Sequence, residues 1–124
     1  MKAILSIKPE FVNKILSGEK KYEFRKKVFK QNIESVIIYS TKPAGVFIGE
    51  FKVNKIVSGD VDKVWSKTNK KAGITYKYYK EYFKNNSVAY ALKIDDLWIY
   101  DHPIDPSSIL PDFKAPQSFC YLRN

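Results

Sequence analysis

The chain contains very little cysteine, histidine or arginine. Cys120 is its one cysteine and His102 its one histidine, and only two of its 22 basic residues, Arg25 and Arg123, are arginines. A single cysteine excludes an internal disulfide framework and is typical of a reducing compartment. Without any cysteine–histidine spacing the sequence offers no set of zinc ligands, so we expect neither a metal nor another cofactor.

Long apolar runs are absent as well. The stretch from Ala3 to Ile7 is too short for the core of a signal peptide, and Lys8 and Pro9 follow it at once. No segment approaches the length of a membrane-spanning helix, and there is no internal repeat or low-complexity block. We therefore expect a cytoplasmic protein that does not enter a membrane.

Lysine and aromatic residues, by contrast, are abundant. Hydrophobic residues make up 44% and aromatic residues 15% of the 124 positions, which is enough for the core of one domain spanning 1–124. The formal net charge is +9, and the basic excess lies in the first two thirds of the chain. Such a charge raises the rate of encounter with polyanions such as nucleic acids. The alternative explanation for this charge is that the protein comes from a lysine-rich proteome, in which lysine is the ordinary surface residue.

The pattern of apolar and polar residues predicts more strands than helices. Strands are expected at 3–7, 20–27, 35–39, 46–56, 88–94 and 97–100, with a tight turn at 95–96 and a short edge strand at 118–122. Helices are expected at 9–17, 61–68 and 76–83, the last two with Asp60 and Thr75 as caps. Side chains alternate along the strand at 88–94, so Val88 is expected on its one buried face. Several strands follow one another without an intervening helix, which favours an antiparallel or mixed sheet. Gly49 marks a bend that helps a sheet to close. We therefore expect an α+β fold, a small mixed β-barrel with helices at its ends and in one excursion.

The second predicted strand carries the most informative group of side chains. On a strand, Tyr22 and Phe24 point to one face, and Glu23 and Arg25 point to the other. Lys20, in the preceding turn, can reach the same rim. An acid, an amine and a guanidinium in one place can bind a nucleotide or transfer a proton. The alternatives are a structural ion pair between Glu23 and Arg25, and a solvated turn lysine at position 20.

Further candidate phosphate contacts lie at the ends of two predicted strands. Lys8 follows the first strand and precedes the start of a helix, where anions are also attracted. Ser40, Thr41 and Lys42 form a loop with two hydroxyls and one amine, which suits a phosphate or a sugar. The alternative is that Lys8 is simply exposed and that the hydroxyls serve turn geometry.

Aromatic residues divide into two groups. Helical spacing assigns Tyr79, Tyr82 and Phe83 to the core, which leaves Tyr76 and Tyr78 as candidates for stacking on bases, as in proteins that bind single strands. His102 lacks an obvious catalytic partner and is interpreted as structural. The aromatic residues assigned to the core are Trp65, Tyr79, Tyr82, Phe83 and Trp98.

The sequence resembles the ASCH domain family, which belongs to the PUA-like superfamily of small β-barrels. The family hallmark Gly-x-Lys-x-x-Glu-x-Arg is met by Gly18, Lys20, Glu23 and Arg25. Supporting matches lie at 6–9, 36–40, 49–51 and 116–119. The resemblance therefore extends over nearly the whole chain.

This resemblance implies a PUA-like barrel that binds RNA in a cleft between the first helix and the sheet. It also gives weight to Gln117 and Ser118, which lie in the closing motif. Some relatives are amidohydrolases that deacetylate N4-acetylcytidine with a lysine, a threonine and a glutamate. Lys20 matches the lysine, but Glu23 stands where the threonine belongs, and 66–75 contains no carboxylate. That trio is incomplete in this chain.

We therefore expect a nucleic-acid-binding domain with a basic cleft, RNA being the favoured nucleic acid and a nucleotide or nucleoside a possible smaller ligand. The alternative is a small enzyme that acts on a modified nucleoside or cleaves RNA, with Lys20 and Glu23 as the proton-transfer pair. The candidate binding residues are Lys8, Lys20, Glu23, Arg25, Ser40, Thr41, Lys42, Gln117 and Ser118.

Overall fold

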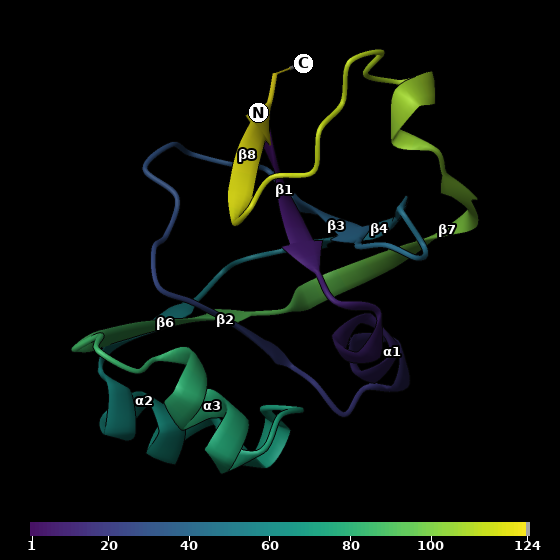
Figure 1. The fold of residues 1–124 in the computed structure, drawn as a ribbon. Coiled ribbons are helices and arrows are strands. Elements are labelled where there is room, and N and C mark those ends of the chain that lie inside the picture. Colours follow the sequence, from purple (N-terminus) through teal and green to yellow (C-terminus); the bar gives the residue numbers. More distant parts are fainter. Residues whose placement is uncertain (124) are drawn as a thin grey trace.

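A computed structural model describes residues 1–123, and within this range eight strands form two sheets accompanied by three α-helices (Figure 1). The strands are β1 Lys2–Ile7, β2 Tyr22–Arg25, β3 Val36–Ser40, β4 Val46–Lys52, β5 Ile56–Asp60, β6 Val88–Lys93, β7 Asp95–Ile104 and β8 Phe119–Leu122. The helices are α1 Pro9–Ser17, α2 Val61–Thr68 and α3 Tyr76–Tyr82, with short 3-10 turns η1 Asn69–Lys71 and η2 Pro106–Ser108. None of these helices is long and apolar enough to cross a membrane.

The larger sheet has the strand order β7-β4-β3-β1-β8 and the smaller one the order β2-β6-β5. β1 and β3 are parallel, and the other neighbouring strands in these two sheets are antiparallel. Only Ile94 separates β6 from β7, so one extended stretch of chain passes from the smaller sheet into the larger one (Figure 1). The expected α+β class with a mixed, PUA-like arrangement of strands is thereby confirmed.

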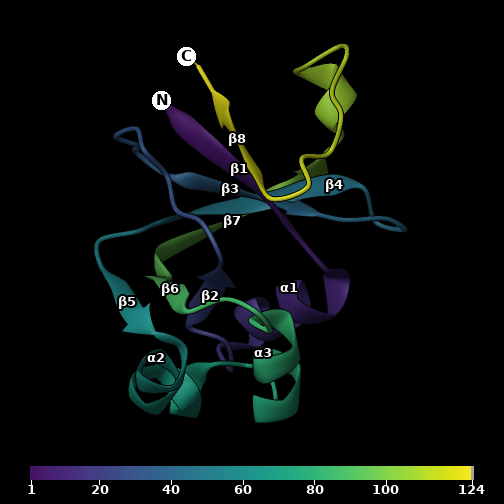
Figure 2. The same ribbon diagram turned by 60° about the vertical axis from the view of Figure 1, so that its left-hand side comes forward.

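Three apolar clusters hold these layers together. The central cluster joins both sheets to α1 and includes Leu5, Phe51 and Leu92. A second cluster packs α2 and α3 on the outer face of the smaller sheet, and a third covers the outer face of the larger sheet with the segment after β7. Figure 2 shows α2 and α3 below the smaller sheet and that segment at the opposite end of the molecule. The smaller sheet is consequently covered on both faces.

Local signals account for where the helices begin and end. Pro9 occupies the first turn of α1, and Gly18 ends that helix in the left-handed conformation, with φ of 85°. The Asp60 carboxylate accepts backbone N–H bonds from the first turn of α2, and the Thr75 hydroxyl accepts one from Tyr78 at the start of α3. These caps confirm the three predicted helices.

The prediction of one long strand at 46–56 was wrong. β4 ends at Lys52, and β5 begins at Ile56 in the other sheet. The register of β4 shifts on both sides of Gly49, and a Cβ atom at that position would collide with the carbonyl oxygen of Trp98. Gly49 therefore allows β7 to approach, as a bend in the sheet requires. β2 is shorter than expected and β7 longer, extending over the predicted turn at 95–96.

Two predictions about burial were also wrong. Val88 was expected on the buried face of its strand but is 42% exposed, whereas Ala89 and Ala91 are fully buried. The alanines pack together with α2 and α3 on the outer face of the smaller sheet. Trp98, expected in the core, is 63% exposed because β7 is the edge strand of the larger sheet.

Candidate functional site

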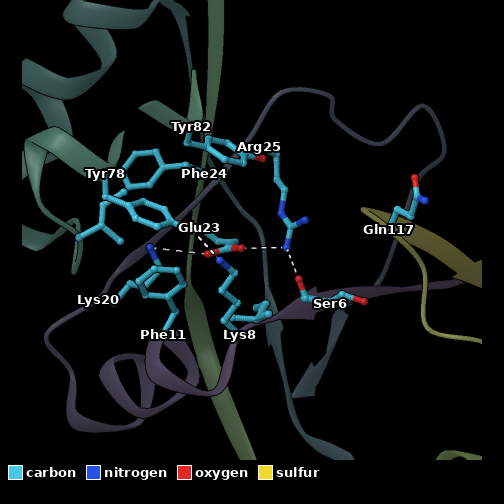
Figure 3. Close-up of a pocket in the computed structure, with 12 residues that line it drawn as sticks. Ser6, Lys8, Phe11, Lys20, Glu23, Phe24, Arg25, Tyr78, Tyr82 and Gln117 are labelled. Atoms are coloured by element: carbon cyan, nitrogen blue, oxygen red, sulfur yellow. Dashed lines mark hydrogen bonds and ion pairs between the residues drawn. The ribbon is translucent and has the colours of Figure 1, made fainter. Parts of the chain in front are cut away.

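A cavity of about 200 Å³ opens between α1, β2 and α3 (Figure 3). Its residues come from parts of the chain that are far apart in sequence. β1 runs directly into α1 on one side of the cavity, and α3 covers the cavity from the opposite side. The residues that line it are Ser6, Ile7, Lys8, Phe11, Lys20, Glu23, Phe24, Arg25, Ile74, Tyr78, Tyr82 and Gln117.

The floor of the cavity is a buried group of three charges. The Glu23 carboxylate lies between the two cations, with Oε2 2.8 Å from Arg25 Nη2 and Oε1 3.6 Å from Lys20 Nζ (Figure 3). Lys20 is 2% exposed, and Glu23 and Arg25 are each 7% exposed. Strand alternation places Glu23 and Arg25 on one face, as predicted. One carboxylate therefore neutralises two buried cations only in part.

Arg25 ties β2 to two other segments. Its Nη2 also donates to the Ser6 carbonyl oxygen in β1 at 2.8 Å, and Nη1 donates to the Ser118 carbonyl oxygen at 3.4 Å. The structural ion pair that we considered as an alternative is thus present. Arg25 Nε, however, is buried and has no hydrogen-bond partner within residues 1–123. An unpaired buried donor of this kind costs about 1–3 kcal/mol.

Lys20 is not a solvated turn lysine. Its Nζ donates to the Ala72 carbonyl oxygen at 2.9 Å and lies 4.9 Å from the ring centroid of Phe24 and 5.6 Å from that of Phe11. Burial lowers the pKa of Lys20, and the attraction of Glu23 opposes this shift only in part. A Cβ atom at Gly73 would collide with the Lys20 side chain, so the loop after η1 is packed directly against it.

The rim of the cavity is aromatic and cationic. The rings of Phe11 and Tyr78 meet edge to face with centroids 5.1 Å apart, and Lys8 Nζ donates to the Tyr78 hydroxyl at 3.3 Å. Tyr78 is 37% exposed, so its ring is accessible from solvent. On the inner side Tyr82 lies under Lys26, and burial raises the pKa of Tyr82. A flat apolar ring and an anion can therefore be accommodated side by side.

Five of the nine predicted binding residues meet at this cavity. They are Lys8, Lys20, Glu23, Arg25 and Gln117. Gln117 lies at the edge of the group, on the side of Ser6 and Arg25 (Figure 3). Ser118 contributes its backbone carbonyl to Arg25, and its side chain does not line the cavity.

The loop after β3 lies outside the cavity. Ser40 is buried at the end of β3, where it is aligned with Ile7, and Thr41 donates its backbone N–H to the Ile7 carbonyl oxygen. From there the chain, including the exposed Lys42, turns back into β4. The three residues therefore do not join the Lys20–Glu23–Arg25 group, because the sheet pairing directs their loop elsewhere.

Sequence reasoning missed several residues of the cavity wall. Phe11 and Phe24 were taken only as parts of apolar faces, Ser6 was noted only as part of the family match, and Ile74 was not considered. Helical and strand periodicity identify an apolar face without showing whether it meets a core or a cavity. Within residues 1–123 no three histidine, cysteine or acidic side chains lie close enough to hold a metal ion.

Comparison with known proteins identifies the class to which this fold and site belong. Residues 5–97 match the ASCH domain. The chain therefore belongs to the ASCH domain family, as the hallmark in and before β2 indicated.

Individual relatives are similar over almost the whole chain. The crystal structure of ASCH from Zymomonas mobilis superposes with a TM-score of 0.90 at 32% identity, covering 98% of this chain and 87% of that one. An ASCH domain-containing ribonuclease from Zymomonas mobilis is 34% identical over 98% of this chain and 84% of its own length. The ATP synthase subunit alpha from Ureaplasma parvum is 31% identical over 97% of this chain, which corresponds to only 15% of that longer protein.

Proposed function

We propose that this domain binds single-stranded RNA and takes one base into the cavity between α1, β2 and α3. The observation that carries the proposal is the buried Lys20–Glu23–Arg25 group at the floor of an aromatic cavity. A buried polar group of this kind is costly unless it serves a ligand or a packed network. Here it lines an accessible cavity.

The size and chemistry of the cavity support a single base as the ligand. At about 200 Å³ it is smaller than the pockets of drug-sized ligands, which occupy about 300–1,000 Å³, and it suits one flat ring system. Tyr78 and Phe11 offer aromatic surface, and the floor offers both donors and an acceptor. RNA is commonly recognised in this way, through unstacked bases of single strands.

Charge supports RNA as the ligand rather than a free base. Lys8 stands at the rim, and the chain as a whole carries a formal charge of +9. Lysines at a rim contact phosphates and make binding dependent on salt. The ASCH domain-containing ribonuclease, 34% identical over nearly the whole chain, also favours RNA.

Two tyrosines of α3 provide the test. Tyr78 lines the cavity, whereas Tyr76 is exposed on the same helix and does not line it. We expect Tyr78→Ala to weaken the binding of a short single-stranded RNA about 5- to 150-fold, since one stacking contact contributes about 1–3 kcal/mol. Fluorescence anisotropy at two salt concentrations measures this. Tyr76→Ala is the matched control, and equal losses in both variants, or no binding by wild type, would overturn the proposal.

Cleavage of RNA is a second candidate function, favoured by the relative that is named a ribonuclease. Attack of a 2′-hydroxyl on the adjacent phosphorus requires a base that takes the hydroxyl proton, and the departing 5′-oxygen takes a proton from an acid or from water. Burial lowers the pKa of Lys20, which raises its neutral fraction at a given pH. Lys20, with Glu23 beside it, is the candidate base.

Gel analysis of an RNA panel tests this second function. We expect cleavage by wild type, no cleavage by a folded Lys20→Met variant, and resistance of the same RNA carrying 2′-O-methyl groups. RNA that remains intact with wild type, or an undiminished rate in Lys20→Met, would exclude this role. The amidohydrolase alternative has less support, because the residues that line the cavity include one carboxylate and no threonine.

A further inference from the structure

A second cavity, of about 310 Å³, lies where α2 ends and η1 begins. It is the larger of the two cavities described here, and three of its residues are lysines while none is acidic. The residues that line it are Tyr22, Ser66, Lys67, Thr68, Asn69, Lys70 and Lys71.

The three lysines of this cavity are not neutralised by the protein. None of the ion pairs found within residues 1–123 includes Lys67, Lys70 or Lys71. All three are exposed, so their ammonium groups are available to a ligand. Three positive charges within five residues repel one another, and an anion placed among them would relieve this repulsion.

The end of helix α2 does not account for these charges. Lysines near a helix C-terminus commonly offset its exposed carbonyl groups. Here two side chains at the helix end already donate hydrogen bonds to several of these carbonyl groups. Thr68 Oγ1 donates to the Val64 carbonyl at 2.8 Å, and Asn69 Nδ2 donates to the carbonyls of Trp65 and Ser66 at 3.0 and 3.1 Å. The lysine ammonium groups are therefore available for a ligand rather than for the helix end.

The two cavities have no lining residue in common, but neighbouring residues of β2 and of the loop after η1 line both. Tyr22 lines the second cavity and its neighbour Glu23 lines the first, on opposite faces of β2. Lys71 lines the second cavity and Ile74 the first, and three residues of chain span at most about 11 Å. The backbone N–H of Lys21 also donates to the Lys71 carbonyl at 2.8 Å, which holds the loop against β2. A ligand seated in one cavity is therefore close to the other.

We propose that the lysine-lined cavity is a phosphate-binding subsite for the RNA backbone, one that holds a phosphate of a nucleotide next to the one in the aromatic cavity. The inference rests on the proposed function. Lysine ammonium groups act as point charges and do not impose the geometry of an arginine fork, so the contact is independent of base sequence. The half-buried Tyr22 lines the same cavity and is placed to contact the sugar or base attached to that phosphate.

The test compares a mononucleotide with a longer single-stranded RNA that contains the same base. The subsite variant combines Lys67→Gln, Lys70→Gln and Lys71→Gln. The control variant combines Lys52→Gln, Lys55→Gln and Lys114→Gln, which removes equal charge at exposed lysines outside both cavities. Calorimetry at several salt concentrations gives the affinity and its salt slope.

We expect the subsite variant to lose roughly tenfold more affinity than the control for the longer RNA, with unchanged binding of the mononucleotide. Its salt slope should also fall by about 0.7 for each phosphate that the lysines no longer neutralise. Equal losses in both variants, with the mononucleotide still bound, would overturn the subsite and leave the proposed function intact. Absence of binding of either ligand to wild type would overturn both.

Discussion

At the scale of single residues, Glu23 both pairs with buried cations and lines the first cavity. Its carboxylate is the one anion among the residues that line the first cavity, and it lies beside the buried cations of Lys20 and Arg25. Removing a charge from water costs several kcal/mol, which only a close opposite charge offsets. The same side chain therefore supports the stability of β2 and leaves acceptor capacity toward a ligand.

We expect Glu23→Gln to lower the free energy of unfolding by about 3–5 kcal/mol, because two buried cations lose their counter-charge. Urea denaturation at neutral pH measures the change. The control is Asp62→Asn, which breaks the solvent-exposed pair with Lys80 and should change the free energy of unfolding far less. Comparable losses in the two variants would contradict the assignment of a buried charge group.

At the scale of elements, the excursion from α2 to α3 builds two walls of the site. The loop after η1 places the Ala72 carbonyl on Lys20 Nζ, and α3 places Tyr78 beside Lys8. Gly73 makes the first of these contacts possible, with φ of 68° and no space for a Cβ atom next to Lys20. Small changes in this loop are therefore transmitted directly to the floor of the cavity.

We expect Gly73→Ala to destabilise the protein more than Gly18→Ala does. Both glycines have positive φ, so both substitutions cost about 1–2 kcal/mol of backbone strain, but a Cβ atom at Gly18 meets nothing within 4 Å. Displacing Lys20 should add about 1–3 kcal/mol to the cost at Gly73 and weaken RNA binding. Thermal unfolding and RNA titration of the two variants check this, and indistinguishable results would refute the contact with Lys20.

At the scale of the whole molecule, Glu50 connects segments from both ends of the chain. Its carboxylate in β4 lies 2.9 Å from Lys2 Nζ in β1 and accepts hydrogen bonds from Ser35 at 2.6 Å and from Tyr100 in β7 at 2.7 Å. Burial by itself would raise the pKa of Glu50, but these partners outweigh it and lower the pKa below its ordinary value of 4.5. The ionised carboxylate is therefore the form that holds the larger sheet.

We expect Glu50→Gln to lower the free energy of unfolding by about 1.5–3 kcal/mol at neutral pH, because Ser35 and Tyr100 would then donate to a neutral amide instead of a charged carboxylate. A carboxyl whose pKa is lowered by folding stabilises fully above its unfolded pKa and loses this effect as pH falls through its folded pKa. The difference between wild type and variant should therefore shrink below pH 4.5. Urea denaturation at decreasing pH measures it, and a constant difference would argue against the ionised form.

Features that depend on near neighbours in the chain could be predicted from the sequence alone. Strand alternation placed Glu23 and Arg25 on one face, and the caps at Asp60 and Thr75 predicted where two helices begin. A cap acts within three residues and alternation has a period of two, so neither needs distant parts of the chain. The hallmark that includes Lys20 was sufficient to indicate the ASCH domain family.

Burial, and the meeting of segments distant in sequence, became visible only in the folded structure. Lys20 is buried because Ala72 and Gly73 pack against it from a loop about fifty positions away, and Tyr78 reaches Lys8 across seventy positions. The small size of Ala89 gave no sign that helices would cover its face of the sheet. Such contacts join segments distant in sequence, and periodicity and capping carry no information about which segments meet.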